Sequence, residues 1–225
     1  MAAIFNKLSQ TRLRAPQSQK ASLDSVIHDL LTWLEPYIRF KLLYSNVPTI
    51  TAMLWGWAGL PPATRHQALP PDLAVIMLDK ACHPHPSGNP DKHKLRMIAP
   101  KHLALLAWSA SRVIPASVAH SEPRVTAAAA AIAFHSARRM HQFSSQGLSL
   151  LAAGLVSLAP AEGKALLTKH LADDAARRIG ALLERQLKAG ELVRLLGACA
   201  DAGLQHGPLF EKAVAAALPQ VGLYG

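Results

Sequence analysis

Residues 101–111 read KHLALLAWSAS, and a similar pattern returns at 146–156 (QGLSLLAAGLV) and at 190–200 (GELVRLLGACA). Each copy has a leucine followed by another leucine three residues later, which places both side chains on one face of an α-helix. Small residues follow the leucines in every copy, so that neighbouring helices can approach closely. The first leucines of successive copies are 45 and 44 residues apart.

A weaker fourth copy lies at 50–60 (ITAMLWGWAGL), where Ile50 and Met53 occupy the leucine positions. Alternating runs of β-branched residues are scarce, and Ala and Leu, which are good helix formers, dominate the chain. Pro and Gly divide it into helical segments. We expect helices over 22–44, 48–59, 70–82, 100–113, 123–141, 145–158, 163–187, 190–202 and 208–217.

Each copy of the pattern is therefore followed by a second helix, and the pair recurs with a period of 44–45 residues. A period in this range is typical of stacked helical arrays, in which one pair cannot bury both of its faces alone. We expect an all-α domain over residues 24–225, built as an α-solenoid-like array of about four antiparallel helical hairpins. The alternative is a non-repeating bundle whose core helices are rich in Leu and Ala.

The composition excludes several classes of protein. The chain has 225 residues, of which 50% are hydrophobic and only 17% are charged, so it can bury a core and is not globally disordered. Two cysteines, Cys82 and Cys199, are too few for a disulfide framework or a four-cysteine zinc site. The formal net charge of +10 favours an anionic partner.

Part of this charge lies in residues 1–23, which hold four basic residues and no acidic one. Spaced basic residues among Ser and Gln, without acids, are typical of a mitochondrial targeting peptide. The alternatives are a disordered tail or an extended N-terminal arm that lies on RNA. The basic residues of this segment are Lys7, Arg12, Arg14 and Lys20.

The rest of the excess lies in residues 92–161, where eight basic residues face Glu122 alone. Arginine suits phosphate because its planar guanidinium donates two parallel hydrogen bonds. A solvated basic face is the alternative, especially for Arg177 and Arg178, since Asp173 and Asp174 lie within one helical turn. The candidate RNA-contacting residues are Lys92, Lys94, Arg96, Lys101, Arg112, Arg124, Arg138, Arg139, Arg177 and Arg178.

Catalytic motifs are missing from the sequence: it has no nucleophile elbow, no HExxH motif and no phosphate-binding glycine loop. Cys and His residues gather in 82–93, but their spacing matches no standard zinc site, and we interpret the segment as a surface loop. We expect no enzyme activity, cofactor, metal or small-molecule substrate. Trp55, Trp57 and Trp108 lie in expected core helices, which disfavours base stacking on exposed rings.

The stretches at 144–158 (SSQGLSLLAAGLVSL) and 188–204 (KAGELVRLLGACADAGL) resemble the organellar octotricopeptide and heptatricopeptide repeats. They also resemble the helical arrays found with RAP domains in FAST-kinase-like proteins. The resemblance covers about residues 46–218, but the period is longer and the chain has no room for a RAP domain. It implies a role in organellar RNA processing, translation or the mitochondrial ribosome, and it identifies no base-reading residue.

Together these features predict a non-catalytic protein of the mitochondrial matrix. The expected role is that of a mitochondrial ribosome component, which binds the backbone of structured RNA, in this case rRNA, and contacts neighbouring proteins. The alternative is a protein scaffold or an accessory subunit of a mitochondrial membrane complex. The uncharged stretches 42–64 and 140–161 contain polar and helix-breaking residues, so we expect contact with a membrane at most and no spanning helix.

Overall fold

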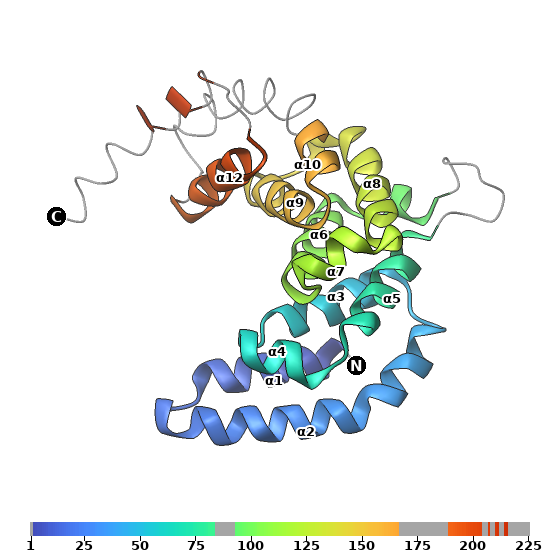
Figure 1. Cartoon of the computed structure of the whole chain (residues 1–225), viewed down its shortest axis with the longest axis vertical. Coiled ribbons are helices and arrows are strands. Elements are labelled where there is room, and N and C mark those ends of the chain that lie inside the picture. The colour runs from blue at the N-terminus through green and yellow to red at the C-terminus, as the bar shows by residue number, and fades with distance from the viewer. Residues whose placement is uncertain are drawn as a thin grey trace.

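The computed structural model describes residues 2–83, 93–166 and 189–203, with a few isolated positions beyond them. Every regular element in these ranges is an α-helix or a 3-10 helix, which confirms the predicted all-α class (Figure 1). The elements are α1 (Ala2–Arg14), α2 (Gln17–Leu42), α3 (Val47–Ala58), α4 (Pro62–Ala68), α5 (Pro71–Cys82), η2 (Lys94–Met97), α6 (Pro100–Val113), α7 (Ala116–Ser121), α8 (Pro123–Ala137), η3 (Met140–Gln142), α9 (Ser145–Leu158), α10 (Pro160–Leu166) and α12 (Ala189–Asp201).

The helices that carry the repeated pattern pack against one another in chain order. Helix α3 contacts α6, α6 contacts α9, and α9 contacts α12. Figure 1 shows the chain rising from α1 and α2 at one end of the long axis to α9 and α12 at the other. The side chains at the predicted ridge positions are all buried, and these are Ile50, Met53, Leu103, Leu106, Leu148, Leu151, Leu192 and Leu195.

The small residues of the pattern allow the close approach between α6 and α9. A Cβ atom added to Gly154 in α9 would lie only 2.5 Å from the carbonyl carbon of Ala107 and from the amide nitrogen of Trp108. The two backbones therefore meet without a side chain between them at this point. A larger residue at 154 would push α9 away from α6, because these neighbouring atoms belong to the main chain.

Two of the expected second helices are also observed. Helix α5 packs against α8, next to the row of pattern-bearing helices. Helix α8 ends at Ala137, four residues before its predicted end, where the chain turns into η3. The expected helix over 163–187 overlaps α10 at its start; the rest of it, and most of 208–217, lie outside the described residues.

Two short helices were not expected. Helix α4 begins at Pro62, and α7 follows Pro115 directly. The sequence predicts helix breaks at these prolines, and α3 and α6 do end shortly before them. Proline also fits the first turn of a new helix, because its fixed φ is already helical and its missing N–H would be unpaired there. A proline boundary in this chain therefore both ends one helix and begins the next.

The N-terminal segment differs from the expected extended arm, because residues 2–14 form a helix that packs on the rest of the chain. Helix α1 contacts α3 and buries Phe5 completely. The Ser9 hydroxyl donates to the carbonyl of Gly59 at 3.2 Å. The Arg12 guanidinium binds both carboxylate oxygens of Asp24, which joins α1 to α2. Helix α1 therefore packs through its apolar face against α3, although the segment is basic in composition.

Within the described part of the chain, no helix combines the length and the apolar character needed to cross a bilayer.

Candidate nucleic-acid interface

Arg139, the second residue after α8, joins two segments that lie about 40 residues apart in the chain. Its Nη1 donates to the carbonyl oxygens of Arg96 and Ile98 at 2.9 and 2.8 Å, and its Nη2 donates to that of Leu95 at 2.8 Å. Its Nε donates to the carbonyl of His135 at 3.3 Å. Burial lowers the pKa of this guanidinium from its ordinary value. The side chain predicted to bind phosphate thus binds the backbone of η2 and fixes it against the end of α8.

The contact made by Arg139 gathers several predicted residues at one end of α6 and α8. Lys94 and Arg96 belong to η2, Lys101 lies in the first turn of α6, and Arg138 directly follows α8. All four are exposed, whereas Arg139 is half-buried. We call these five residues the basic cluster. They come from three elements, and their charges accumulate on one part of the surface.

Two buried histidines lie beneath the basic cluster. The rings of His93 and His135 are 4.6 Å apart between centroids. The pKa of His135 is lowered to about 4, mainly by burial and further by electrostatic interaction with His93 and with three nearby arginines. Burial also lowers the pKa of His93, whose Nδ1 accepts from the Leu95 amide at 3.1 Å while Nε2 lies 2.9 Å from the Cys82 carbonyl. Because the Leu95 amide donates to Nδ1, the neutral His93 ring carries its proton on Nε2.

Arg138 and Arg96 contribute directly to the low pKa of His135, which places their charges near this buried ring. The guanidinium of Arg138 lies 4.6 Å from the centroid of the Phe134 ring, in the geometry of a cation–π contact. The positive field at this end of α8 is therefore produced by residues from both sequence segments. It adds to the effect of burial on the pKa of His135, and it attracts anions at the surface.

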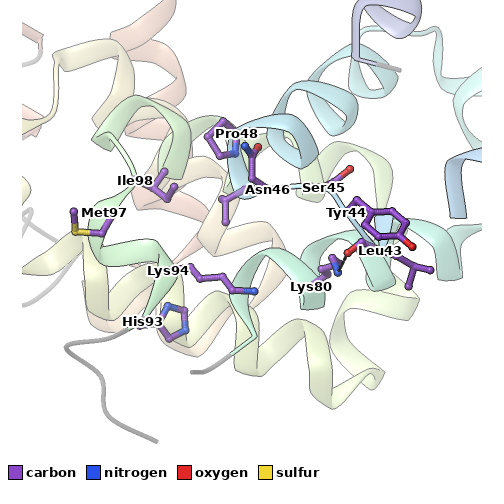
Figure 2. Close-up of a pocket in the computed structure, with 11 residues that line it drawn as sticks. Leu43, Tyr44, Ser45, Asn46, Pro48, Lys80, His93, Lys94, Met97 and Ile98 are labelled. Atoms are coloured by element: carbon purple, nitrogen blue, oxygen red, sulfur yellow. Dashed lines mark hydrogen bonds between the residues drawn. The ribbon is translucent and has the colours of Figure 1, made fainter. Parts of the chain in front are cut away.

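A pocket of about 740 Å³ lies beside the basic cluster, between η2 and the turn that joins α2 to α3. Lys94 belongs to both features. Figure 2 shows Lys94 and Lys80 reaching into the space between these segments, with Asn46 and Tyr44 from the turn. Lys80 Nζ donates to the carbonyl of Leu43 at 3.0 Å. None of the described residues that line the pocket is acidic, so its charged groups favour an anion.

The remaining candidates of the second basic region lie elsewhere. Arg112 is near the end of α6 and Arg124 is near the start of α8, so each lies one helix length, about 15–20 Å, from the basic cluster. The guanidinium of Arg112 lies 5.9 Å from the ring centroid of Trp108. Arg124 forms a salt bridge with Glu122 at 2.9 Å. The structure therefore divides the predicted basic surface into separate parts.

The other predicted residues fall into two groups. Arg12 forms a salt bridge with Asp24 and lowers the pKa of the Asp24 carboxyl. Lys7 and Arg14 are exposed on α1, and Lys20 is half-buried on α2. Three further candidates lie outside the described residues, and they are Lys92, Arg177 and Arg178.

Of the three tryptophans expected in core helices, Trp57 packs as predicted, whereas Trp55 is 36% exposed and Trp108 is half-buried. Trp57 is fully buried, and its Nε1 donates to the carbonyl of Arg65 at 2.9 Å. The rings of Trp55 and Trp108 lie 5.0 Å apart between centroids, so α3 and α6 meet through them. These rings belong to helix packing, and they form no stacking platform beside the basic cluster.

The cysteine thiols are buried and protonated. Burial raises the pKa of Cys82 far above its ordinary value and raises that of Cys199 to about 11. A protonated, buried thiol is a poor nucleophile and a poor metal ligand. Among the residues that the structure describes, no three His, Cys, Asp or Glu side chains come together as a metal site.

The sequence interpretation missed the two arginines that bind backbone carbonyls. Arg139 is one, and buried Arg65 is the other, since its guanidinium donates to the carbonyls of Leu60 and Arg112. Backbone carbonyls are present at every residue, so such a partner leaves no motif in the sequence. Arg139 lies two residues beyond the end of α8, where carbonyls lack intrahelical partners, whereas Arg65 lies inside α4 and has no such signal.

No protein-family model matches the chain, and no curated protein matches it. The basic cluster, the pocket beside it and the packing of the helices are therefore the features from which a function can be inferred.

Proposed function

We propose that this chain is a non-catalytic, RNA-associated helical-repeat protein of the mitochondrial matrix, and that it is a component of the mitochondrial ribosome. The basic cluster is the proposed contact with the RNA backbone. The observation that carries the proposal is that the bonds of Arg139 join two basic segments, on which Lys94, Arg96, Lys101 and Arg138 are all exposed.

The chemistry of the basic cluster fits phosphate. Among the described residues, no carboxylate pairs with Lys94 or Lys101, so their ammonium groups are available to an external anion. Lysine and arginine contacts to phosphates release counterions, which is the main source of affinity in binding that does not depend on base sequence. Docking on already folded RNA needs only this charge and a matching shape.

Salt-titrated binding of a structured RNA to the full-length protein tests this proposal. The logarithm of the binding constant should fall with the logarithm of salt concentration, with a slope of about −2 to −4 for a few phosphate contacts. Replacing two lysines of the basic cluster, in K94Q/K101Q, should weaken binding and reduce the steepness by about 2. The matched control, K41Q/K164Q, removes the same net charge from α2 and α10 and should keep the wild-type slope.

The proposal fails if the wild-type chain does not bind RNA at low salt, or if its affinity is independent of salt. It also fails if the two double variants lose affinity equally, because binding would then follow net charge and not the basic cluster. Circular dichroism of both variants checks that the fold is retained.

The second candidate function is that of a protein scaffold or an accessory subunit of a mitochondrial membrane complex. A line of exposed apolar side chains on α2 favours it, since contiguous apolar surface marks interaction sites. Fractionation of a mitochondrial lysate distinguishes the two functions. Co-sedimentation with ribosomal particles that is lost after RNase treatment supports the first, and co-migration with a membrane complex that survives RNase supports the second.

A further inference from the structure

Helix α2 is apolar on two faces, and the structure covers only one of them. Its inner face packs on the core through buried side chains, which are Ile27, Leu31, Leu34, Ile38 and Leu42. Its outer face, with the turn after it, carries a second line of large apolar side chains at helical spacing, and all of these are exposed. This outer line, which we call the α2 aromatic face, consists of Val26, Trp33, Tyr37, Phe40 and Tyr44.

The exposure of the α2 aromatic face is extensive. Trp33 and Tyr44 are each 77% exposed, and Phe40 is 54% exposed. The Phe40 and Tyr44 rings pack edge to face at 5.7 Å between centroids, so the face is preordered. Figure 1 shows α2 along the outer edge of the molecule, beyond α1 and α4. A helix that is apolar on both faces is expected to have a neighbour on each.

The charges around this face disfavour RNA as its partner. Helix α2 contains three basic and three acidic residues. Arg39 is already paired with Glu35 and Asp72. The Lys41 ammonium lies over the Tyr37 ring, 5.3 Å from its centroid, so its charge is already engaged in a cation–π contact. A neutral apolar face gives no electrostatic attraction to a polyanion.

The same properties fit a second copy of this chain. A twofold dimer requires a surface that complements itself, and an apolar line with balanced charges can meet its own copy without like-charge repulsion. From Val26 to Tyr44 the face extends roughly 27 Å along the helix. Its side chains expose roughly 600 Å² per chain, given the area that large side chains bury. Two copies would bury roughly 1,200 Å², which reaches the range of stable interfaces.

We propose that the protein forms a symmetric homodimer through the α2 aromatic face, with two α2 helices packed against each other. Trp33 and Tyr37 lie near the middle of the face and act as its anchors, because large aromatic residues at an interface centre contribute most of the affinity. This inference goes beyond the proposed RNA contact and is independent of it, since the basic cluster lies on other elements.

Analytical ultracentrifugation of the full-length, nuclease-treated protein tests the dimer. The wild-type chain should sediment as a species of about 48 kDa, twice the 24.1 kDa of the chain. The variants W33E and Y37E should each weaken self-association by about tenfold or more, and W33F should retain it. The matched control is V193E, which places the same charge at an equally exposed apolar position on α12 (69% exposed).

A monomeric wild-type chain overturns the proposal, as does a dimer that W33E and Y37E leave unchanged. Equal loss of the dimer in V193E also overturns it, because the interface would then involve α12. A monomer that co-sediments with anionic phospholipid vesicles, and loses this in W33E, assigns the face to lipid instead. RNA affinity measured on the same W33E protein should be unchanged, so that failure of the dimer and failure of the RNA contact are distinguished.

Discussion

At the scale of single residues, Arg139 is the clearest case of a side chain whose role depends on its surroundings. Its guanidinium donates to the carbonyls of Leu95, Arg96 and Ile98, close to the point where η2 ends. The Leu95 carbonyl also accepts from the Ile98 amide at 3.3 Å, and a guanidinium with several donors can bind all three carbonyls together. An arginine predicted to contact RNA thereby positions the exposed basic residues around it.

The variant R139K should therefore destabilise the protein although it keeps the charge. A lysine ammonium cannot reach several carbonyls in the fork geometry of a guanidinium, so buried acceptors lose their donors. We expect the free energy of unfolding in urea to fall by about 2 kcal/mol. The control R124K alters an exposed arginine paired with Glu122, and it should change stability by less than about 0.5 kcal/mol. Equal stabilities of R139K and wild type would refute this role.

The buried histidines predict a dependence of stability on pH. The unfolded chain protonates His135 near pH 6.5, about the ordinary value, whereas the folded chain does so only at about 4. Between these values the unfolded state binds more protons, so the free energy of unfolding decreases as the pH falls. Protonation of His93 would also remove the acceptor of the Leu95 amide.

We expect stability to be highest above about pH 6.5 and to fall by about 2 kcal/mol by pH 4.5, measured by urea unfolding at each pH. The variant H135F removes one titrating group and should flatten the profile in this window. In H135F the free energy of unfolding should still depend weakly on pH, because His93 remains. An unchanged profile in H135F would show that other groups control the acid sensitivity.

At the scale of elements, most of the fold could be predicted because hydrophobic spacing and proline positions act locally. The leucine ridges of α6, α9 and α12 recur every 44–45 residues, and the buried positions agree with them. The missed helices α4 and α7 begin at or directly after prolines that also mark breaks. A proline signals a boundary, and it does not state whether a helix or a loop follows it.

Two glycines in pattern-bearing helices provide a test of the packing between elements. G154A would place a Cβ 2.5 Å from the backbone of α6, so we expect destabilisation by about 1–3 kcal/mol. G197A in α12 meets nothing within 4 Å, and it should stabilise by about 0.5–1 kcal/mol through helix propensity. Thermal unfolding of both variants measures the difference. Equal effects would contradict the close contact between α6 and α9.

At the scale of the whole molecule, the row of helices α1, α3, α6, α9 and α12 makes contacts mainly between neighbours. We expect the row to behave as a stacked array, in which stability is a sum over units and their interfaces, so that a destabilising change at one end affects mainly the neighbouring helices. The contact at the N-terminal end depends on Phe5, which is fully buried between α1 and α3.

The variant F5A should therefore lose about 3 kcal/mol of local stability. Amide hydrogen exchange is expected to accelerate in α1 and α3 and to remain slow in α9. The variant I4A, at a half-exposed neighbouring position, is the control and should change little. Uniform acceleration in all helices would indicate one cooperative unit and would contradict a stacked array.

The residues of the basic cluster could be predicted from the sequence, but their arrangement in space could not. Its members were all among the predicted residues, because an excess of charge in a segment can be counted directly. Their grouping was not predictable, since the segments that carry Lys94 and Arg138 are joined by the bonds of Arg139 to backbone carbonyls. The same holds for Arg112 and Arg124, which share that segment but lie at the opposite ends of their helices.

The helical class, most helix boundaries, the buried ridges and the charged segments could all be predicted from the amino-acid sequence. Each of these follows from short-range regularities, since a helix repeats every 3.6 residues and net charge adds along the chain. Three features emerged only from the packing of the folded chain: the N-terminal segment packs as α1, Arg139 binds carbonyls, and α2 leaves an aromatic face uncovered. These depend on which surfaces meet, and contacts between distant segments leave no periodic signal in the sequence.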